Sequence, residues 1–408
     1  MKNEQVIRAQ SARFDSFYLY DEAIIQARIA GLRQSFPAAQ FLYSVKANPA
    51  PALLRRIFAA GLGADAASLG EVQLAHRMGL APDRIYYSAP AKTPADLAGA
   101  LDDCVLIADS PREIELIQQL AAARGAVASI GVRLNPDFTF AGDGGAASKF
   151  GIDEGEAFAL LAHWKTLANV RIVGLHVHSR SQELDAGVLG RYYERMFDLA
   201  ARFAAANGAP LAFVNMGSGI GIPYAPGDRP VDTAALGARE SALAAQFAAR
   251  LPGTRVLIET GRHVVGESGV YVTRVLDRKQ SHGRTFLLLA NTLNGFARPS
   301  LARLVLHYAP DAAPAASEPL FTCADAFRIE TLPADGAAET VTLTGNLCTA
   351  TDVVAENIVL PHLEPGGLVV LTNAGSYAAV LSPMQFAALT PPAQLLLCAD
   401  GSVADACV

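Results

Sequence analysis

Short apolar runs alternate with helix-like stretches over the first two thirds of the chain. Between about residue 40 and residue 262, each β-prone run ends in small or polar residues and is followed by a stretch rich in Ala, Leu, Arg and Glu. The predicted strands are 41–47, 63–68, 84–90, 105–110, 128–135, 171–179, 211–219 and 255–261. Eight successive βα units favour a closed parallel (β/α)8 barrel. The pattern also fits an open doubly wound sheet and does not decide between the two.

The pattern changes after residue 262. Strand-like runs without long helical spacers follow at 270–279, 285–292, 339–346 and 366–375. They predict a predominantly β second domain, to which we expect the early run 17–21 to add a strand. The predicted organisation is a barrel over 26–262 and a β-rich domain built from 1–25 and 263–408. The Pro/Ala-rich segment 307–319 is predicted to be a surface loop.

Composition narrows the class of protein. Of the 408 residues, 51% are hydrophobic and 18% are charged, which excludes a disordered chain and favours a large core or subunit interfaces. The net charge of −6 gives no basic field for nucleic acid or anionic lipid. We therefore expect the partner to be a small molecule or a second copy of the chain.

The cysteines and the N-terminal residues indicate the compartment. The cysteines are Cys104, Cys323, Cys348, Cys398 and Cys407, an odd and scattered set without a CxxC pair. This spacing argues against a disulfide framework and against a zinc cage. Residues 1–17 lack the apolar region of a signal peptide, and no run approaches the ~20 apolar residues of a membrane span. The sequence thus predicts a soluble cytoplasmic protein with reduced thiols.

Polar residues collect where the predicted barrel strands end, which is the working face of a βα barrel. These residues are Lys46, Asp65, Ser88, Arg133, Asn135, His178, Ser179, Arg180, Ser181, Gly217, Ser218, Gly219, Glu259 and Arg262. Polar groups at one end of an apolar barrel are costly unless they bind something, so we expect an active site there. His176 and His178 alternate along their predicted strand, so only one of them is expected to face the barrel mouth.

The chemistry of this set is specific. Lys46 lies in the apolar setting YSVKAN, where desolvation disfavours the ammonium form and leaves an amine nucleophile. The turn GSGIG offers backbone N–H groups to a phosphate, and Arg262 could add a fork of donors. Glu259 would keep a ring nitrogen protonated. A lysine, a phosphate cradle and an acidic ring partner are what pyridoxal 5'-phosphate (PLP) requires.

With these residues assembled, the sequence resembles the fold-type III PLP-dependent decarboxylases, which include diaminopimelate, ornithine and arginine decarboxylases and share the fold of alanine racemase. The resemblance runs from residue 17 to residue 397 and rests on YSVKAN, DAASLGE, HVHSRS, NMGSGIG and IETGR. It implies that Lys46 carries PLP covalently, that His178 packs against the cofactor ring and that Glu259 pairs with its nitrogen. The other cofactor contacts that it implies are Asp65, Arg133, Ser181, Gly217, Ser218, Gly219, Gly261, Arg262 and Tyr377, and Glu71 is carried over with Asp65.

The resemblance extends into the second domain. GNLCTATD matches a segment that crosses into the neighbouring subunit's active site, which makes Cys348 the proton donor and places Asp352 close by. NAGSYAAVLS assigns Tyr377 as a phosphate or substrate contact. The implied reaction removes the α-carboxylate as CO2 and then protonates the α-carbon from Cys348 of the partner subunit. The implied assembly is an obligate homodimer with two shared sites.

Departures from the family pattern bear on the substrate. Thr349 stands where relatives that act on diamines or diaminopimelate carry an acidic residue, and Arg180 replaces a glycine. The run RPSLA keeps Arg298 but has Ala302 at a tyrosine position. The pattern resembles the citryl-diaminopropionate decarboxylases of staphyloferrin B-type siderophore biosynthesis. That resemblance implies a citrate-linked diaminopropionate substrate, with Arg180 and Arg298 on citrate carboxylates and Thr349 and Asp352 as further substrate contacts.

Alternative functions remain at this point. The first is decarboxylation of meso-diaminopimelate or another basic amino acid. The second is a metal-dependent amidohydrolase, which also uses a barrel with an HxH motif. That class carries the motif on strand 1, whereas here it lies on strand 6, and the other histidines do not end predicted strands, so we expect no metal. A non-enzymatic PLP-binding relative should have lost Lys46 or Cys348, and the chain has both.

Overall fold

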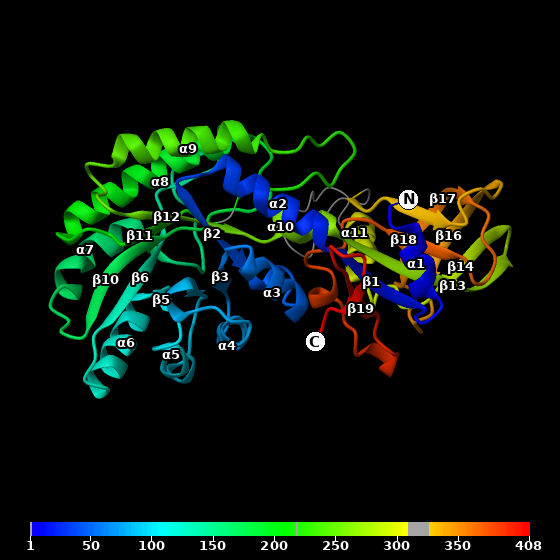
Figure 1. Cartoon of the computed structure of the whole chain (residues 1–408), viewed down its shortest axis with the longest axis horizontal. Helices are drawn as coiled ribbons and strands as arrows, with labels where there is room; N and C mark the ends of the chain where they lie inside the picture. Colours follow the sequence, from blue (N-terminus) through cyan, green and yellow to red (C-terminus); the bar gives the residue numbers. More distant parts are fainter. Residues whose placement is uncertain (1, 218, 309–325) are drawn as a thin grey trace.

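The computed structural model describes residues 2–217, 219–308 and 326–408 and shows a barrel joined to a smaller β-rich part (Figure 1). Most of the predicted surface loop 307–319 lies outside the described residues. Its first two residues, which are described, end the helix α11 (Ala297–Tyr308) and are not part of a loop.

Eight parallel strands close into the barrel, which confirms the first of the two architectures that the sequence allowed. They are β2 (Ala39–Ser44), β3 (Gly63–Ala66), β4 (Ile85–Ser88), β5 (Val105–Ala108), β6 (Ala128–Asn135), β10 (Val170–His176), β11 (Phe213–Asn215) and β12 (Arg255–Thr260). Each pairs with the next, β6 pairs with β10, and β12 returns to pair with β2. Because the sheet has no open edge at this seam, the doubly wound alternative is excluded.

Several predicted strands end earlier than the apolar runs suggested. Lys46 lies in the short 3-10 turn η1 (Val45–Ala47), and His178 lies two residues beyond the end of β10. The excursion after β6 contains the hairpin β7 (Phe138–Thr139) and β8 (Gly142–Asp143) and then β9 (Ile152–Asp153), which the sequence did not predict.

Helices cover the outside of the barrel (Figure 1). They are α2 (Glu22–Ser35), α3 (Pro51–Ala59), α4 (Leu69–Arg77), α5 (Pro94–Ala100), α6 (Pro111–Ala123), α7 (Glu154–Trp164), α8 (Ala186–Asn207) and α9 (Thr233–Phe247). Local chemistry starts them after the strands, since Ser68, Thr93 and Ser110 each cap a helix by accepting a backbone N–H bond. Proline in the first turn of α3, α5 and α6 also suits a helix start.

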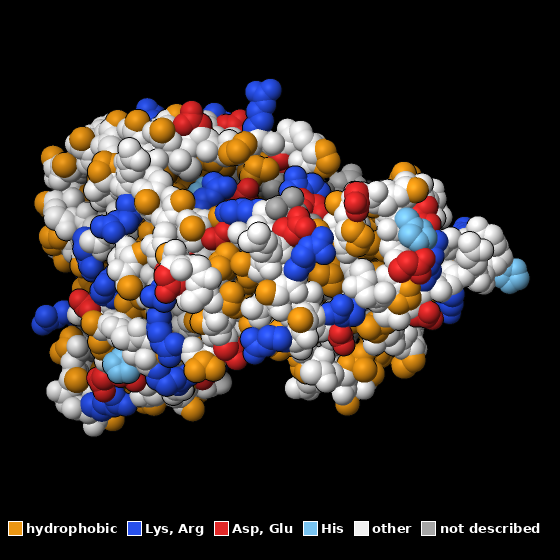
Figure 2. Space-filling model, turned by 45° about the vertical axis from the view of Figure 1, so that its right-hand side comes forward, with side chains coloured by type: hydrophobic (Ala, Val, Ile, Leu, Met, Phe, Trp, Pro, Cys, Tyr) orange, Lys and Arg blue, Asp and Glu red, His pale blue; other side chains and the backbone are white. Residues whose placement is uncertain are grey.

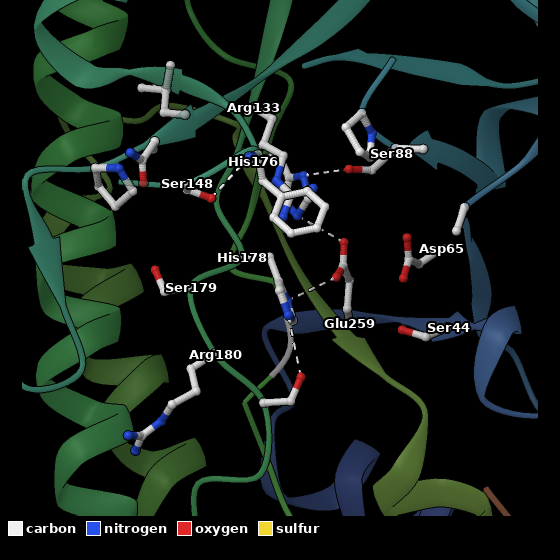
Figure 3. A pocket seen from close by; sticks show the side chains of 18 of the residues that line it. Ser44, Asp65, Ser88, Arg133, Ser148, His176, His178, Ser179, Arg180 and Glu259 are labelled. Carbon is white, nitrogen blue, oxygen red and sulfur yellow. Dashed lines mark hydrogen bonds and ion pairs between the residues drawn. The ribbon is translucent and has the colours of Figure 1, made fainter. Parts of the chain in front are cut away.

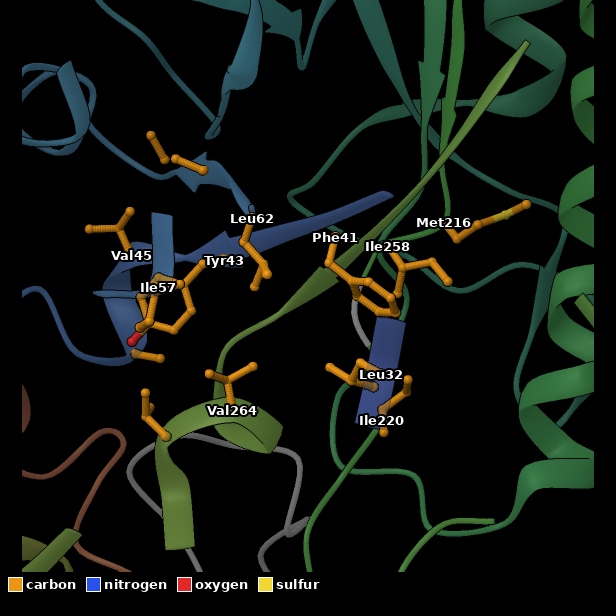
Figure 4. Packing of buried hydrophobic residues seen from close by; sticks show 14 of the residues in the cluster. Leu32, Phe41, Tyr43, Val45, Ile57, Leu62, Met216, Ile220, Ile258 and Val264 are labelled. Carbon is orange, nitrogen blue, oxygen red and sulfur yellow. The ribbon is translucent and has the colours of Figure 1, made fainter. Parts of the chain in front are cut away.

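The strands alternate between an outer and an inner face. Figure 4 shows outward residues such as Phe41 and Tyr43 of β2 and Ile258 of β12 packed against Leu32 and Ile57 of the surrounding helices. The inward residues form a separate apolar plug that consists of Leu42, Tyr86, Ile107, Phe213 and Leu257. Phe213 fits because Gly131 and Gly174 face it, where a Cβ would come within 2.9 and 2.1 Å of its ring.

The β-rich part is one branched sheet with the order β17-β16-β14-β13-β1-β19-β20, to which β18 and β15 are attached. Its strands are β1 (Ser16–Asp21), β13 (Gly269–Ser281), β14 (Arg284–Leu289), β15 (Ile329–Leu332), β16 (Ala338–Gly345), β17 (Val353–Pro361), β18 (Leu368–Leu371), β19 (Ala393–Leu397) and β20 (Val403–Asp405). β1 pairs antiparallel with β13 and parallel with β19, so the N-terminal run joins strands from the far end of the chain. The helix α1 (Glu4–Ser11) packs Ile7 against this sheet, and α10 (Arg262–Val265) leads out of the barrel.

The surface carries charges of both signs. Figure 2 shows basic and acidic side chains interspersed over both parts of the molecule on the face in view. Within the described ranges, none of the helices combines the length and the apolar character that a membrane crossing needs.

Glu240 on α9 gives a prediction about pH. Its side chain is fully buried, and its Oε1 has no hydrogen-bond partner among the described residues. Burial raises the pKa of Glu240 from 4.5 to about 7. Between these two values the folded chain holds a proton that the unfolded chain releases, so this residue lowers stability as the pH rises through that window.

We expect Glu240→Gln to raise the free energy of unfolding by roughly 1–3 kcal/mol at about pH 8 and to change it little at about pH 4, as measured by urea denaturation. The exposed Glu156 of α7 provides the control, because Glu156→Gln should give no pH-dependent gain. An equal gain at both pH values would contradict this account of Glu240.

Candidate active site

A polar layer lies directly above the apolar plug of the barrel. Two residues beyond each inward position of the plug level, every strand carries a polar residue: Ser44, Asp65, Ser88, Asp109, Arg133, His176, Asn215 and Glu259. All eight are buried. Six of them line a cavity of about 590 Å³ together with Lys46, His178, Arg262 and Tyr377. The period of two along each strand therefore places one polar side chain per strand at the barrel mouth (Figure 3).

Lys46 reaches the cavity from the turn after β2 and pairs with Asp65, with Nζ 2.9 Å from Oδ2. Burial acts to lower the pKa of Lys46, but Asp65, Tyr377 and Glu259 outweigh it and hold the pKa above its ordinary value. The expectation that desolvation leaves a neutral amine is therefore wrong for the chain by itself, because two buried carboxylates face the ammonium. Burial and Glu259 together raise the pKa of Asp65. Glu71 accepts a bond from the backbone N–H of Ala67 at 2.7 Å and so braces the turn after β3.

Glu259 is the most heavily contacted carboxylate of the layer. Its Oε1 accepts from Asn215 Nδ2 at 2.9 Å and lies 3.1 Å from His176 Nε2, while Oε2 lies 3.7 Å from His178 Nδ1. Burial acts to raise the pKa of Glu259, but His176, His178 and Lys46 together hold it below the ordinary value. The side chain is therefore an ionised acceptor within the cavity.

Both histidines of the HVH run face the cavity, so the expectation that only one would do so is wrong. The expectation misapplied the period of two, because residues two apart on a strand point to the same face and His178 lies two positions after His176, the last residue of β10. Burial lowers the pKa of His178 to about 3, helped by Lys46, Arg133 and His176. His178 is thus a neutral ring at the centre of the cavity, and its Nε2 lies 3.4 Å from Ser181 Oγ (Figure 3).

Gly261 and Arg262 line the cavity, whereas Gly217 and Gly219 of the glycine turn are not among its lining residues. Gly217 has φ +69°, and a Cβ there would lie 2.3 Å from the carbonyl oxygen of Val177, so the turn requires glycine. Gly261 lines the cavity where a Cβ would come within 2.8 Å of Ala47. The buried Arg262 donates to Gln182 Oε1 at 3.1 Å. Gly219 follows in the same turn, and Ser218 lies outside the described residues.

Tyr377 is brought to the cavity from the β-rich part. Its backbone N–H donates to the carbonyl of Ala47 at 2.9 Å, and its ring lies 5.4 Å from the guanidinium of Arg262. The segment after β18 is thereby fixed against the turn that carries Lys46.

Arg133 is held in place by contacts with Asp109 and with the ring of Phe150. Its Nη1 lies 3.4 Å from Asp109 Oδ1, and its guanidinium is 4.5 Å from the ring centre of Phe150. Glu113 accepts from the backbone N–H of Asp109 and forms a fully buried ion pair with Lys92 at 2.7 Å. Apart from ordinary helix-start residues, no sequence pattern predicts this supporting pair.

The cavity fits PLP. It offers the amine of Lys46, the ionised carboxylate of Glu259 and, beside Gly261, the buried guanidinium of Arg262 for a phosphate. Its volume lies within the usual range for small-molecule sites. Lys46, Asp65, His178, Glu259 and Arg262 are brought together as the sequence analysis expected.

The two arginines that the sequence predicts as substrate contacts differ in their position relative to the cavity. Arg180 lines the cavity, pairs with Glu183 and lies 5.1 Å from the ring centre of Phe140. Arg298 does not line this cavity: it is fully buried, with Nη1 3.3 Å from the carbonyl of Ser376. The first turn of α11 packs it between Tyr224 and Phe327, so the chain by itself does not present it to a ligand in the cavity.

The segment with Cys348 lies between β16 and β17, and neither Cys348 nor Thr349 lines the cavity of its own chain. Cys348 is exposed. The predicted substrate contact of Asp352 is not supported, because this carboxylate is buried and accepts from the backbone N–H groups of Leu293 and Leu347, both at 3.0 Å, and from the hydroxyl of Thr292. Asp352 instead fixes the base of the loop that carries Cys348.

Sequence reasoning missed four contributors to the mouth. Ser44, Asn215 and Asp109 belong to the polar layer but were not singled out, and the excursion after β6 adds Phe138 and Phe150 to the lining. These three polar residues could have been found from the period of two, because each lies two residues after a plug residue. The excursion carries no comparable pattern.

Comparisons with known proteins agree with this geometry. The family described as pyridoxal-dependent decarboxylase, pyridoxal binding domain, matches residues 22–266. The chain is 30% identical over 407 residues to the L-glutamyl-(BtrI acyl-carrier protein) decarboxylase of Niallia circulans, covering 96% of this chain and 90% of that protein. It is 28% identical to the diaminopimelate decarboxylase of Aquifex aeolicus, covering 95% and 87%.

A solved structure shows the same fold. The diaminopimelate decarboxylase of Helicobacter pylori complexed with L-lysine superposes with a TM-score of 0.83 at 24% identity, covering 98% of this chain and 95% of that chain.

The amine in the cavity gives a direct prediction. Wild-type protein reconstituted with PLP should be fixed to its cofactor by borohydride, and mass spectrometry should place the adduct on Lys46. Lys46→Ala should give no adduct, while Lys165→Ala, which changes a lysine outside the cavity lining, should behave as wild type. A borohydride-fixed adduct in Lys46→Ala would show that another amine carries the cofactor.

Proposed function

We propose a substrate for this chain, which belongs to the pyridoxal-dependent decarboxylase family and is a PLP-dependent amino-acid decarboxylase. The proposed substrate is an amino-acid unit whose far end is joined to a larger acidic or acyl group. A citrate-linked diaminopropionate is the specific substrate we propose. The α-carboxylate of that unit leaves as CO2.

The charges of the cavity carry this proposal. In the described lining the acidic side chains are Asp65 and Glu259, and both are buried and already in contact with basic groups. A distal ammonium group of the substrate would therefore find no available carboxylate among the described residues that line the cavity. Arg180, which is 47% exposed and lines the cavity, instead offers guanidinium donors to an anion. Thr349, at the position where the diamine decarboxylases carry an acidic residue, agrees with this.

One relative supports the broader class of substrate. The Niallia circulans protein is named for an L-glutamyl group carried on an acyl-carrier protein, which is also an amino-acid unit attached through a larger partner. The alternative is meso-diaminopimelate, for which the Aquifex aeolicus relative is named. The position of Arg180 at the cavity and of Thr349 in the Cys348 loop favours a substrate joined to a larger acidic or acyl group over meso-diaminopimelate.

PLP, when bound, accepts into its ring the electrons that the departing CO2 leaves at the α-carbon. We assign Lys46 to carry the cofactor, and Arg262 with the turn at Gly217 to bind its phosphate. His178 would pack against the ring as a neutral side chain. Glu259 would hold the proton on the ring nitrogen, where an ionised carboxylate stabilises positive charge.

A homodimer completes the proposed site. Cys348 is exposed and outside its own cavity, on a loop whose base Asp352 fixes. We assign Cys348 of the partner subunit to donate the proton that replaces CO2 on the α-carbon. Each active site would then contain residues from both chains.

Substrate comparison tests the proposal. We expect kcat/KM to be at least ~10-fold higher for citryl-diaminopropionate than for meso-diaminopimelate, which corresponds to about 1.4 kcal/mol. Arg180→Ala should lower kcat/KM for the citrate-linked substrate by roughly 10- to 100-fold, the usual effect of losing a charged hydrogen bond. Arg191→Ala, an exposed arginine of α8 outside the cavity lining, is the matched control. A clear preference for meso-diaminopimelate would overturn the proposed substrate.

Mixing two inactive variants tests the shared site. Lys46→Ala and Cys348→Ala should each be nearly inactive alone. When they are unfolded together and refolded, random pairing should restore roughly a quarter of wild-type activity, because half of the dimers hold one intact site. No recovery in a mixture that contains heterodimers by native mass spectrometry would count against the partner subunit's Cys348 as the proton donor.

A further inference from the structure

Four buried side chains of the polar layer form one connected network. Ser88 Oγ lies 3.0 Å from His176 Nδ1, and His176 Nε2 lies 3.1 Å from Glu259 Oε1. Asn215 Nδ2 donates to the same Oε1 at 2.9 Å. Ser88, His176, Asn215 and Glu259 come from four different strands and are each at most 8% exposed. Figure 3 shows Ser88 and Glu259 each joined to His176 by a dashed line.

The network fixes the proton on His176. A serine hydroxyl can donate to Nδ1, and the carboxylate can only accept, so the consistent arrangement has Ser88 donating to Nδ1 and the proton of His176 on Nε2. The N–H end of the imidazole then lies 3.1 Å from Glu259 Oε1, a close polar contact rather than a hydrogen bond. Without Ser88, the tautomer with its proton on Nδ1 would turn a lone pair toward the carboxylate.

The network also gives the two carboxylate oxygens of Glu259 different contacts. Two groups, Asn215 and His176, converge on Oε1, whereas the contact of Oε2 with His178 Nδ1 is longer, at 3.7 Å. One oxygen is therefore held within the layer and the other remains to accept from a ligand in the cavity. Other charged or titratable groups that act on this carboxylate are Lys46, Asp65 and Tyr192.

Asn215 links this carboxylate to the glycine turn. Its Oδ1 accepts from the backbone N–H of Gly217 at 2.9 Å, and the carbonyl of Gly217 accepts from the backbone N–H of Glu259 at 2.9 Å. The position of Glu259 and the conformation of the turn are thus fixed by the same buried amide.

We propose that Ser88, His176 and Asn215 are positioning residues that act through Glu259, holding its Oε1 so that Oε2 accepts a hydrogen bond from the protonated ring nitrogen of PLP. The inference concerns the cofactor and is independent of which amino acid is the substrate. Ser88 and His176 contact each other and Glu259 rather than Lys46 or the glycine turn, so their removal should act mainly on the ring nitrogen, whereas loss of Asn215 would also disturb the turn.

His176→Leu and His176→Gln separate this role from a structural one. Leu removes the N–H group that faces Glu259, and the Gln amide can donate in its place. The surface pair His163–Glu115 supplies the control variant His163→Leu, because it changes a histidine–glutamate contact outside the cavity lining. Ser88→Ala tests the tautomer and keeps the measurement possible if His176→Leu does not fold.

The readout is NMR of holo-protein containing PLP isotopically labelled at the ring nitrogen, together with PLP affinity by equilibrium dialysis. In wild type and His163→Leu the nitrogen should be protonated. In His176→Leu its signal should move toward the neutral form, PLP should bind roughly 10-fold more weakly and kcat should fall more than KM rises. Ser88→Ala should shift the signal in the same direction by less, and His176→Gln should restore it.

Two results would overturn the inference. One is a fully protonated ring nitrogen in both His176→Leu and Ser88→Ala, even if these variants melt at a lower temperature, since a merely structural role predicts that outcome. The other is a His176→Gln variant that matches His176→Leu, because the polar contact with Glu259 would then not be what His176 contributes.

Discussion

The structure depends on burying an ionised carboxylate at the mouth of an apolar barrel. Glu259 is 3% exposed, and an isolated charge there would cost several kcal/mol. Its neighbours offset that cost, because Asn215 and His176 contact one oxygen while His178 and Lys46 add favourable charge or dipole. These groups come from three separate segments of the sequence, because the two histidines share the end of β10. The barrel must therefore close correctly for the carboxylate to remain ionised.

The same constraint organises the layers of the barrel. The lower interior of the barrel is filled by apolar side chains, among them Leu42, Phe213 and Leu257. The polar layer begins two residues further along the same strands, with Ser44, Asn215 and Glu259. The plug excludes water from below, which strengthens every electrostatic contact above it. Support from outside the layer is of the same kind, since the buried Lys92–Glu113 pair holds the turn that positions Asp109 and Arg133.

Much of this could be predicted from the sequence, for identifiable reasons. The eight strands follow from local apolar runs, and Lys46, Asp65, Glu259 and Arg262 follow from strand ends. What failed depended on tertiary contacts. The raised pKa of Lys46 comes from carboxylates on other strands, and the burial of Arg298 comes from Tyr224 and Phe327. Likewise, the prediction that Asp352 contacts the substrate rested on its spacing from Cys348. That spacing does not show that the backbone N–H groups of Leu293 and Leu347 already donate to the Asp352 carboxylate.

A crystal structure of the PLP-bound protein tests the central claim most directly. The account predicts that Glu259 Oε2 lies within hydrogen-bond distance of the ring nitrogen, about 2.7–3.0 Å, while Oε1 keeps its contacts with Asn215 and His176. It would be contradicted by a cofactor whose ring nitrogen faces a basic side chain such as Arg133, or by a Glu259 that turns away from the ring.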